Sequence, residues 1–120
     1  MNHLLHATAA RATRYREGLT TRRVYPAPDA IHALTGLDEP LPNRPTDPET
    51  VLAQLDELGS PATVAMAGGR YFGFVNGSSL PATLAANWLA AAWDQNVALR
   101  VMSPIAAKLE EVSTRWLVEL

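Results

Sequence analysis

The chain has 120 residues, of which 48% are hydrophobic and 18% charged, enough to form one domain and too apolar for extensive disorder. Its net charge of -2 argues against a dedicated nucleic-acid binder, and the lack of cysteine excludes disulfides, thiolate metal sites and thiol nucleophiles. No secretory signal is visible at the start, so we expect a cytoplasmic protein without a nucleic-acid partner.

The charges are distributed unevenly along the chain. Residues 1–25 carry five arginines against one glutamate, whereas residues 26–60 carry seven acidic residues against one arginine. Arginines that share a helix are usually solvated or paired with acidic side chains. We therefore expect the N-terminal arginines to face solvent or to pair with the acidic stretch.

The first half of the chain predicts short helices. The first helix is expected over His3–Glu17, and Gly18 should end it. The proline-rich stretch that follows can hold only short helices, such as one over Asp29–Leu34. Thr46 and Glu49 have the spacing of a capping box and predict the start of another helix.

That helix carries an apolar stripe formed by Val51, Leu52, Leu55 and Leu58, and Gly59 should end it. A short helical turn can begin at Ser60. These elements complete a region that is helical and rich in proline.

The second half opens with a change of pattern. The aromatic residues of Arg70–Val75 predict a β-strand, and Asn76–Ser79 predicts a turn. Pro81–Trp93 predicts an alanine-rich helix that should be buried on most faces. The span 71–93 has no charge, but its turn-forming residues argue against a membrane helix, so we expect no membrane partner.

The last helix should start at Ser103 as N-cap. An exposed Glu111–Arg115 pair is expected on its polar face. Its inward apolar stripe would consist of Ile105, Leu109, Val112, Trp116, Leu117 and Leu120. Because this stripe reaches Leu120, we expect the sequence to be a segment of a longer polypeptide.

Candidate chemical groups are few. His3 and His6 share a helix face, but a closed metal site needs three or four ligands. The glycines and serines match neither a phosphate-binding loop nor a nucleophile elbow. Lys108, the only lysine, has Glu110 and Glu111 beside it, which predicts a surface position rather than a Schiff-base role.

Several stretches match one known family in the same order: Gly69–Pro81, Trp93–Asn96 and Ser103–Glu110. They resemble the N-terminal signature of the group II pyridoxal-phosphate-dependent decarboxylases, which include the aromatic-amino-acid and glutamate decarboxylases. Trp116-Leu117 fits the same pattern. There are two departures: Gly68-Gly69 stands where the family has His-Pro, and Lys108 stands where it has threonine.

The resemblance implies a mainly α-helical N-terminal segment of a fold-type I pyridoxal-phosphate enzyme that lacks the large α/β domain. Residues 1–60 would be a helical, proline-rich segment that clasps the second copy in a homodimer. Residues 61–120 would be a strand–turn–helix segment leading into the cofactor-binding domain. Because the family's cofactor-binding residues lie in that domain, this chain alone is expected to bind no pyridoxal phosphate and to be inactive.

The resemblance also implies substrate-binding positions. Phe74, Val75 and Asn76 would form part of the substrate-pocket wall, and Asn96 to Ala98 would reach the active site of the other subunit. Alternatively, the aromatic residues pack in a core or interface and Asn76 only favours the turn. The complete relative would decarboxylate a small amino acid, using pyridoxal phosphate as electron sink.

Two other functions stay open. The chain could be a stand-alone helical dimerisation or interaction module without catalysis. It could also be a small metal- or anion-binding domain that uses His3, His6 and the arginines.

Overall fold

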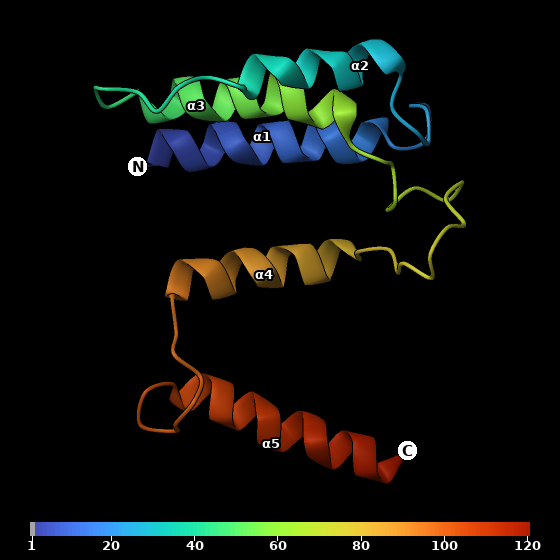
Figure 1. Ribbon diagram of the computed structural model, residues 1–120. Coiled ribbons are helices and arrows are strands. Elements are labelled where there is room, and N and C mark those ends of the chain that lie inside the picture. Colours follow the sequence, from blue (N-terminus) through green and yellow to red (C-terminus); the bar gives the residue numbers. More distant parts are fainter. Residues whose placement is uncertain (1) are drawn as a thin grey trace. The chain divides into compact units, whose positions relative to one another are not determined.

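The computed structural model describes residues 2–120, and over this range the chain is mainly α-helical and contains no β-strand (Figure 1). The mainly helical fold class predicted from the sequence is confirmed. The chain divides into two compact units, one ending at Ser78 and the other beginning at Ser79, and each is described by itself.

The first unit begins with the long helix α1, Asn2–Gly18, which matches the predicted first helix. The carbonyl of Gly18 accepts hydrogen bonds from the backbone N–H groups of Thr21 and Arg22, at 3.2 and 3.0 Å. These bonds form the turn that follows the helix. The proline-rich region then forms α2, Pro28–Ala33, which continues into the 3₁₀ turn η1, Leu34–Leu37.

The next helical stretch changes its winding along its length. It consists of α3, Pro48–Gln54, then the π-type turn η2, Leu55–Gly59, and the 3₁₀ turn η3, Ser60–Ala62. The helical turn predicted at Ser60 is therefore confirmed as η3. The predicted end at Gly59 was wrong, because the α-helix ends at Gln54 and helical winding continues through Gly59, which keeps a right-handed backbone conformation.

The predicted N-cap of this stretch was wrong. Asp47, not Thr46, caps α3, and its Oδ2 accepts a hydrogen bond from the Thr50 backbone N–H at 3.0 Å. The reason is Pro48, which occupies the first helical position and makes the residue directly before it the cap.

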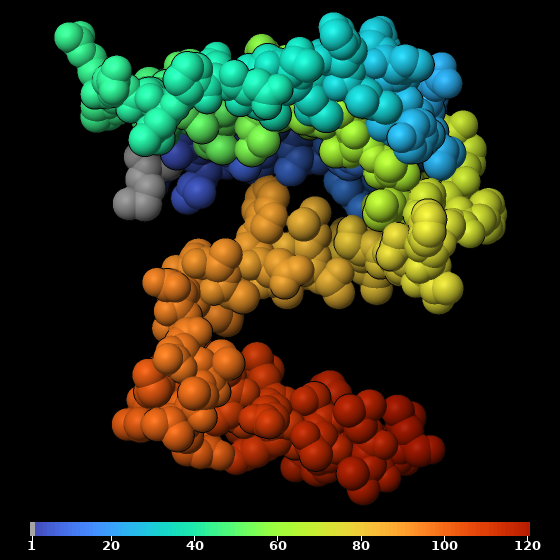
Figure 2. Space-filling view, viewed as in Figure 1, coloured from blue at the N-terminus to red at the C-terminus, as the bar shows by residue number. Residues whose placement is uncertain are grey.

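The helices of the first unit pack in pairs: α1 contacts α3, α2 contacts η3, and η1 contacts η2. Between η1 and α3 the chain projects from this unit (Figure 2), and Leu41 there is 92% exposed. The predicted apolar stripe of α3 and η2 is only partly covered, because Leu52 and Leu58 are half-buried whereas Val51 and Leu55 are exposed.

Two well-buried apolar residues of the first unit lie where the chain after α1 meets the chain after η3. Leu19 and Ala65 are 6% and 2% exposed, and the Ala65 backbone N–H donates to the Val24 carbonyl at 2.9 Å. A side chain at Gly68 would lie 3.2 Å from the Ala65 carbonyl and 3.3 Å from that of Leu19. Any other residue at this position would require these carbonyls to shift by a few tenths of an ångström, so glycine suits this close backbone approach.

The strand predicted over Arg70–Val75 is absent from the described chain, which instead forms bends and turns there. Phe74 and Val75 both have left-handed backbone conformations, with φ of 54° and 55°. Such angles are incompatible with a strand, and β propensity is only realised against a neighbouring strand, which residues 2–120 do not supply.

The second unit contains α4, Pro81–Trp93, and α5, Pro104–Glu119. Both match the predicted helices, and Ser103 caps α5 as predicted, its Oγ accepting from the Ala106 N–H at 3.4 Å. Asp94 ends α4 in a left-handed conformation with φ of 47°.

The predicted burial of α4 and the inward stripe of α5 were wrong for this chain. Among the described residues, neither helix has a buried side chain. Trp88 and Trp93 of α4 are 44% and 48% exposed, and Trp116 and Leu117 of α5 are 63% and 71% exposed. Apolar periodicity predicts which helix face is apolar, but it does not predict whether other residues of the same chain pack against that face.

Candidate functional site

The predicted substrate-wall residues lie in the irregular segment before Ser78. Phe74 and Val75 are almost fully exposed, at 92% and 104%, and neighbouring Phe72 is 93% exposed. Asn76 is better anchored, because its Nδ2 lies 3.4 Å from Tyr71 Oη and 3.5 Å from Met66 Sδ. The segment therefore combines exposed apolar side chains with one fixed amide group.

Asn96 and Ala98, the other predicted substrate-binding residues, lie in the second unit between α4 and α5. Asn96 Oδ1 accepts a hydrogen bond from the Ala98 backbone N–H at 3.0 Å. Both residues are exposed. The amide side chain thus holds a local turn, as asparagine often does.

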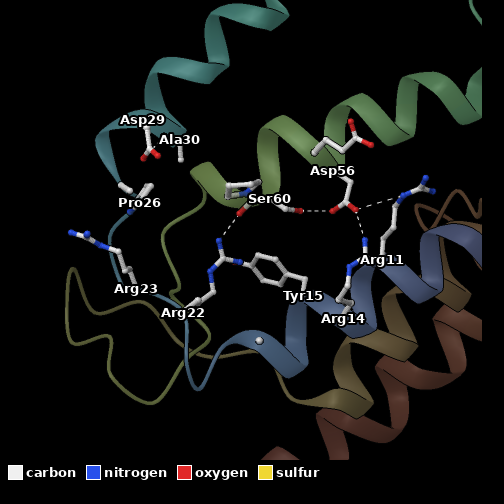
Figure 3. A pocket seen from close by; sticks show the side chains of 14 residues that line it. Arg11, Arg14, Tyr15, Arg22, Arg23, Pro26, Asp29, Ala30, Asp56 and Ser60 are labelled. Carbon is white, nitrogen blue, oxygen red and sulfur yellow. Dashed lines mark hydrogen bonds and ion pairs between the residues drawn. The ribbon is translucent and has the colours of Figure 1, made fainter.

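A cavity of about 640 Å³ lies in the first unit (Figure 3). Its lining comes from the last turns of α1, the chain after Gly18, the start of α2 and the region from Asp56 to Pro61. Charged side chains dominate the lining, Tyr15 is its one aromatic residue, and two hydrogen-bonded clusters organise these groups (Figure 3).

The first cluster is centred on Asp56. Its Oδ2 lies 2.8 Å from Arg14 Nη2 and 3.6 Å from Arg11 Nε, and its Oδ1 accepts from Ser60 Oγ at 2.6 Å (Figure 3). The Asp56 and Arg11 side chains are 18% and 21% exposed. Arg11 Nη1 is buried and has no hydrogen-bond partner in the described chain. The predicted pairing of N-terminal arginines with the acidic stretch is confirmed here.

The second cluster is centred on Arg22. Its guanidinium carbon lies 4.6 Å from the centre of the Tyr15 ring, and its Nη2 donates to the Ser60 carbonyl at 2.6 Å. Tyr15 Oη is itself hydrogen-bonded to Thr63 Oγ1 at 2.8 Å. This arrangement fixes the position and plane of a half-buried guanidinium group.

Sequence reasoning missed the Tyr15–Arg22–Ser60 cluster. The opposite charges of residues 1–25 and 26–60 left two outcomes open: arginines facing solvent, or arginines paired with the acidic stretch. The stacking of Arg22 on Tyr15 was not visible, because the chain turns after Gly18 and helical periodicity no longer predicts which side chains are neighbours.

The histidines form no metal centre in the part of the chain that the structure describes. His3 Nδ1 lies 3.4 Å from Glu49 Oε2 on the surface. Within residues 2–120 there is no group of three or more histidine, aspartate or glutamate side chains that could hold a metal ion. No helix in the same range has the length and apolar character needed to cross a membrane.

Lys108 is exposed as predicted, with 65% of its side chain accessible and its Nζ 3.4 Å from Glu111 Oε2. Arg100 also pairs with Glu111. The predicted Glu111–Arg115 pair is therefore replaced by pairs with Arg100 and Lys108. These two cations, mainly Arg100 through its hydrogen bond, lower the pKa of Glu111 below its usual value.

Comparison of the chain with protein-family models, with curated proteins and with solved structures finds no match.

Proposed function

We propose that this chain is the N-terminal portion of a pyridoxal-phosphate-dependent amino-acid decarboxylase, a carboxy-lyase, in which it forms subunit interface and part of the substrate-pocket wall. Its partners would be a second copy of the chain in a homodimer, the rest of the decarboxylase polypeptide and a small amino-acid substrate. The ordered motifs from Gly69 to Trp116 support this family assignment.

The observation that carries the interface role is the exposed apolar surface of α4 and α5. Trp88, Leu89 and Trp93 of α4 are 44 to 54% exposed, and Trp116 and Leu117 of α5 are more exposed still. Covering one large apolar side chain contributes about 1.5 to 3 kcal/mol. Several large exposed apolar side chains on two helices favour an interaction surface, and a second subunit with a large domain would cover them.

The pocket-wall role is supported by the segment Phe72–Asn76. Three apolar side chains are almost fully exposed there, next to an amide held by Tyr71 and Met66. Small-molecule sites combine apolar walls with a few fixed polar groups. In a complete enzyme, this segment would supply one such wall.

The residues of this chain do not fit a cofactor-binding role. A lysine that forms a Schiff base is activated in an apolar pocket or beside another cation. Lys108 instead lies on an exposed helix face and pairs with Glu111. The chain therefore would contribute shape and contacts, and the cofactor chemistry would belong to the rest of the polypeptide.

The first experiment is to purify the product of the native gene from its own cell. We expect an intact mass several times 13.0 kDa, bound pyridoxal phosphate by mass spectrometry, and carbon dioxide release from particular amino acids. A product near 13.0 kDa without cofactor would contradict the proposal.

The pocket-wall assignment has a separate test in that enzyme. Phe74→Ala and Asn76→Ala should each raise KM for the amino acid about tenfold, the scale of one lost pocket contact. Leu41→Ala is the matched control, because Leu41 is equally exposed but lies in the proline-rich segment. Equal kinetics for the Phe74 and Leu41 variants would refute the wall role and leave the interface role standing.

The second candidate function is a stand-alone helical dimerisation or interaction module without catalysis. The same exposed apolar faces of α4 and α5 favour this function, since they would be buried by a partner whether or not the protein is an enzyme. It predicts helicity that increases with protein concentration in the absence of pyridoxal phosphate. Constant helicity from low to high micromolar concentration would count against it.

A further inference from the structure

The cavity of the first unit lies outside the residues that the proposed function uses. Its volume of about 640 Å³ falls within the range of small-molecule sites. Figure 3 shows the Arg22 guanidinium between Tyr15 and Ser60, with Pro26 and Ala30 lying toward α2. The cavity is thus formed by segments that are distant in sequence.

Arg22 is the best-prepared binding group in this cavity. The Tyr15 ring supports its guanidinium at 4.6 Å, and the Ser60 carbonyl holds one nitrogen at 2.6 Å. A guanidinium group has five N–H donors, and no further acceptor for them is found among residues 2–120. The remaining edge can make the paired hydrogen bonds that arginine forms with a carboxylate.

The surrounding charges define the ligand more closely. Asp56 does not neutralise Arg22, because it pairs with Arg14 and Arg11. The whole lining contains four arginines, two aspartates and one glutamate, so it carries one net positive charge. Asp29 and Glu57 would repel a ligand with several negative charges.

We propose that this cavity binds a small organic monocarboxylate. The carboxylate would lie against the free edge of the Arg22 guanidinium, and an apolar body would pack against Tyr15, Pro26 and Pro61. A single negative charge matches the net charge of the lining, and the prolines and the tyrosine provide apolar surface for the rest of the ligand.

The test uses the 120-residue chain without pyridoxal phosphate, so its result is independent of the decarboxylase proposal. Phenylacetate and its neutral isostere phenylacetamide are titrated by ligand-observed NMR. We expect phenylacetate to bind about tenfold or more tightly, as for one charged hydrogen-bonded contact. Equal affinities, or no binding of phenylacetate at tens of millimolar, would overturn the proposal.

Substitutions then locate the site. Arg22→Gln should weaken phenylacetate binding about tenfold or more, whereas Arg115→Gln, an arginine of α5, should leave it unchanged. Because Arg22→Gln removes the contact with Ser60, Arg22→Lys serves as a second variant that keeps the charge but loses the paired geometry. Undiminished binding in a folded Arg22 variant, or equal loss in Arg115→Gln, would refute the assignment.

Discussion

Asp56 in η2 links this turn to α1 through its contacts with two arginines. It accepts from Arg14 and from Ser60, and it lies close to Arg11. Asp56→Asn should lower the free energy of unfolding by about 1 to 3 kcal/mol, because it removes a charge from a partly buried network. Urea denaturation followed by circular dichroism measures this loss.

Asp38→Asn is the control for this prediction, since Asp38 lies in the exposed segment after η1. Both substitutions remove one negative charge from the chain. Equal unfolding free energies for the two variants would show that the Asp56 contacts do not stabilise the fold.

Ser103 is the one residue that the second unit buries, with 1% of its surface exposed. Its Oγ caps α5. Ser103→Ala should therefore cost about 1 kcal/mol, the usual value for a lost N-cap. Helix content measured during thermal unfolding tests this, with Ser113→Ala as control because Ser113 is an exposed serine within the same helix. A Ser103 variant as stable as the Ser113 variant would argue against a capping role.

Glu111 makes the stability of α5 sensitive to acid. Its pKa is lowered from about 4.5 by Arg100 and Lys108. Because the pKa of Glu111 is lower in the folded state than in the unfolded state, its ion pairs stabilise the folded chain at pH values above the usual pKa. This stabilisation is lost as the pH falls through the lowered pKa of the folded state. Because the Glu111 side chain is exposed, the effect should be small and weakened by salt.

An NMR titration of the α5 amides from neutral to acid pH measures this effect. Glu111→Gln should remove the transition, whereas Glu110→Gln should preserve it, because the neighbouring Glu110 forms no ion pair within residues 2–120. An unchanged transition in Glu111→Gln would assign the acid sensitivity to another group.

At the scale of whole elements, helix starts were the most predictable feature. Pro81 and Pro104 each occupy a first helical position, and Ser103 provides the cap, so local chemistry alone determines these boundaries. The strand was not predictable in the same way. A strand depends on hydrogen bonds to a neighbour, and Gly73 followed by two left-handed residues forms a turn instead.

The candidate sites show the same division between local and long-range effects. Asn76 was predicted as a turn residue with an available amide, and its side chain does hold the local turn through Tyr71 and Met66. The Arg22–Tyr15 stack depends on a reversal of the chain after α1 and on Ser60, 38 positions later in the sequence. Such contacts between distant segments cannot be read from local patterns.

The exposed segment Phe72–Val75 should be the first point of proteolytic attack. Its aromatic side chains are more than 90% exposed, and it lies just before the division between the two units. Brief chymotrypsin treatment should therefore cleave after Phe72 or Phe74 and give two fragments by mass spectrometry. Phe72→Ser combined with Phe74→Ser should abolish this early cleavage. Cleavage that begins instead at Leu41, the exposed control site, would contradict the prediction.

At the scale of the whole molecule, tryptophans and tyrosines lie in different units. All three tryptophans lie in the second unit, and all three tyrosines lie in the first. Tryptophan fluorescence therefore reports on the uncovered faces of α4 and α5 alone. If a second copy covers these faces, the emission should shift to shorter wavelength as the protein concentration rises.

The response to salt distinguishes apolar association from charge pairing. Sulfate strengthens the burial of apolar surface, whereas salt screens interactions between exposed charges. We expect added sulfate to move the fluorescence transition to lower protein concentration. Leu117→Lys should move it to higher concentration, because it places a charge on the exposed apolar face of α5. Leu41→Lys makes the same chemical change in the proline-rich segment and should have no effect. Two results would contradict this prediction: sulfate moves the transition to higher protein concentration, or both lysine variants shift it equally. Either result would show that copies of the chain do not associate through the tryptophan-bearing faces.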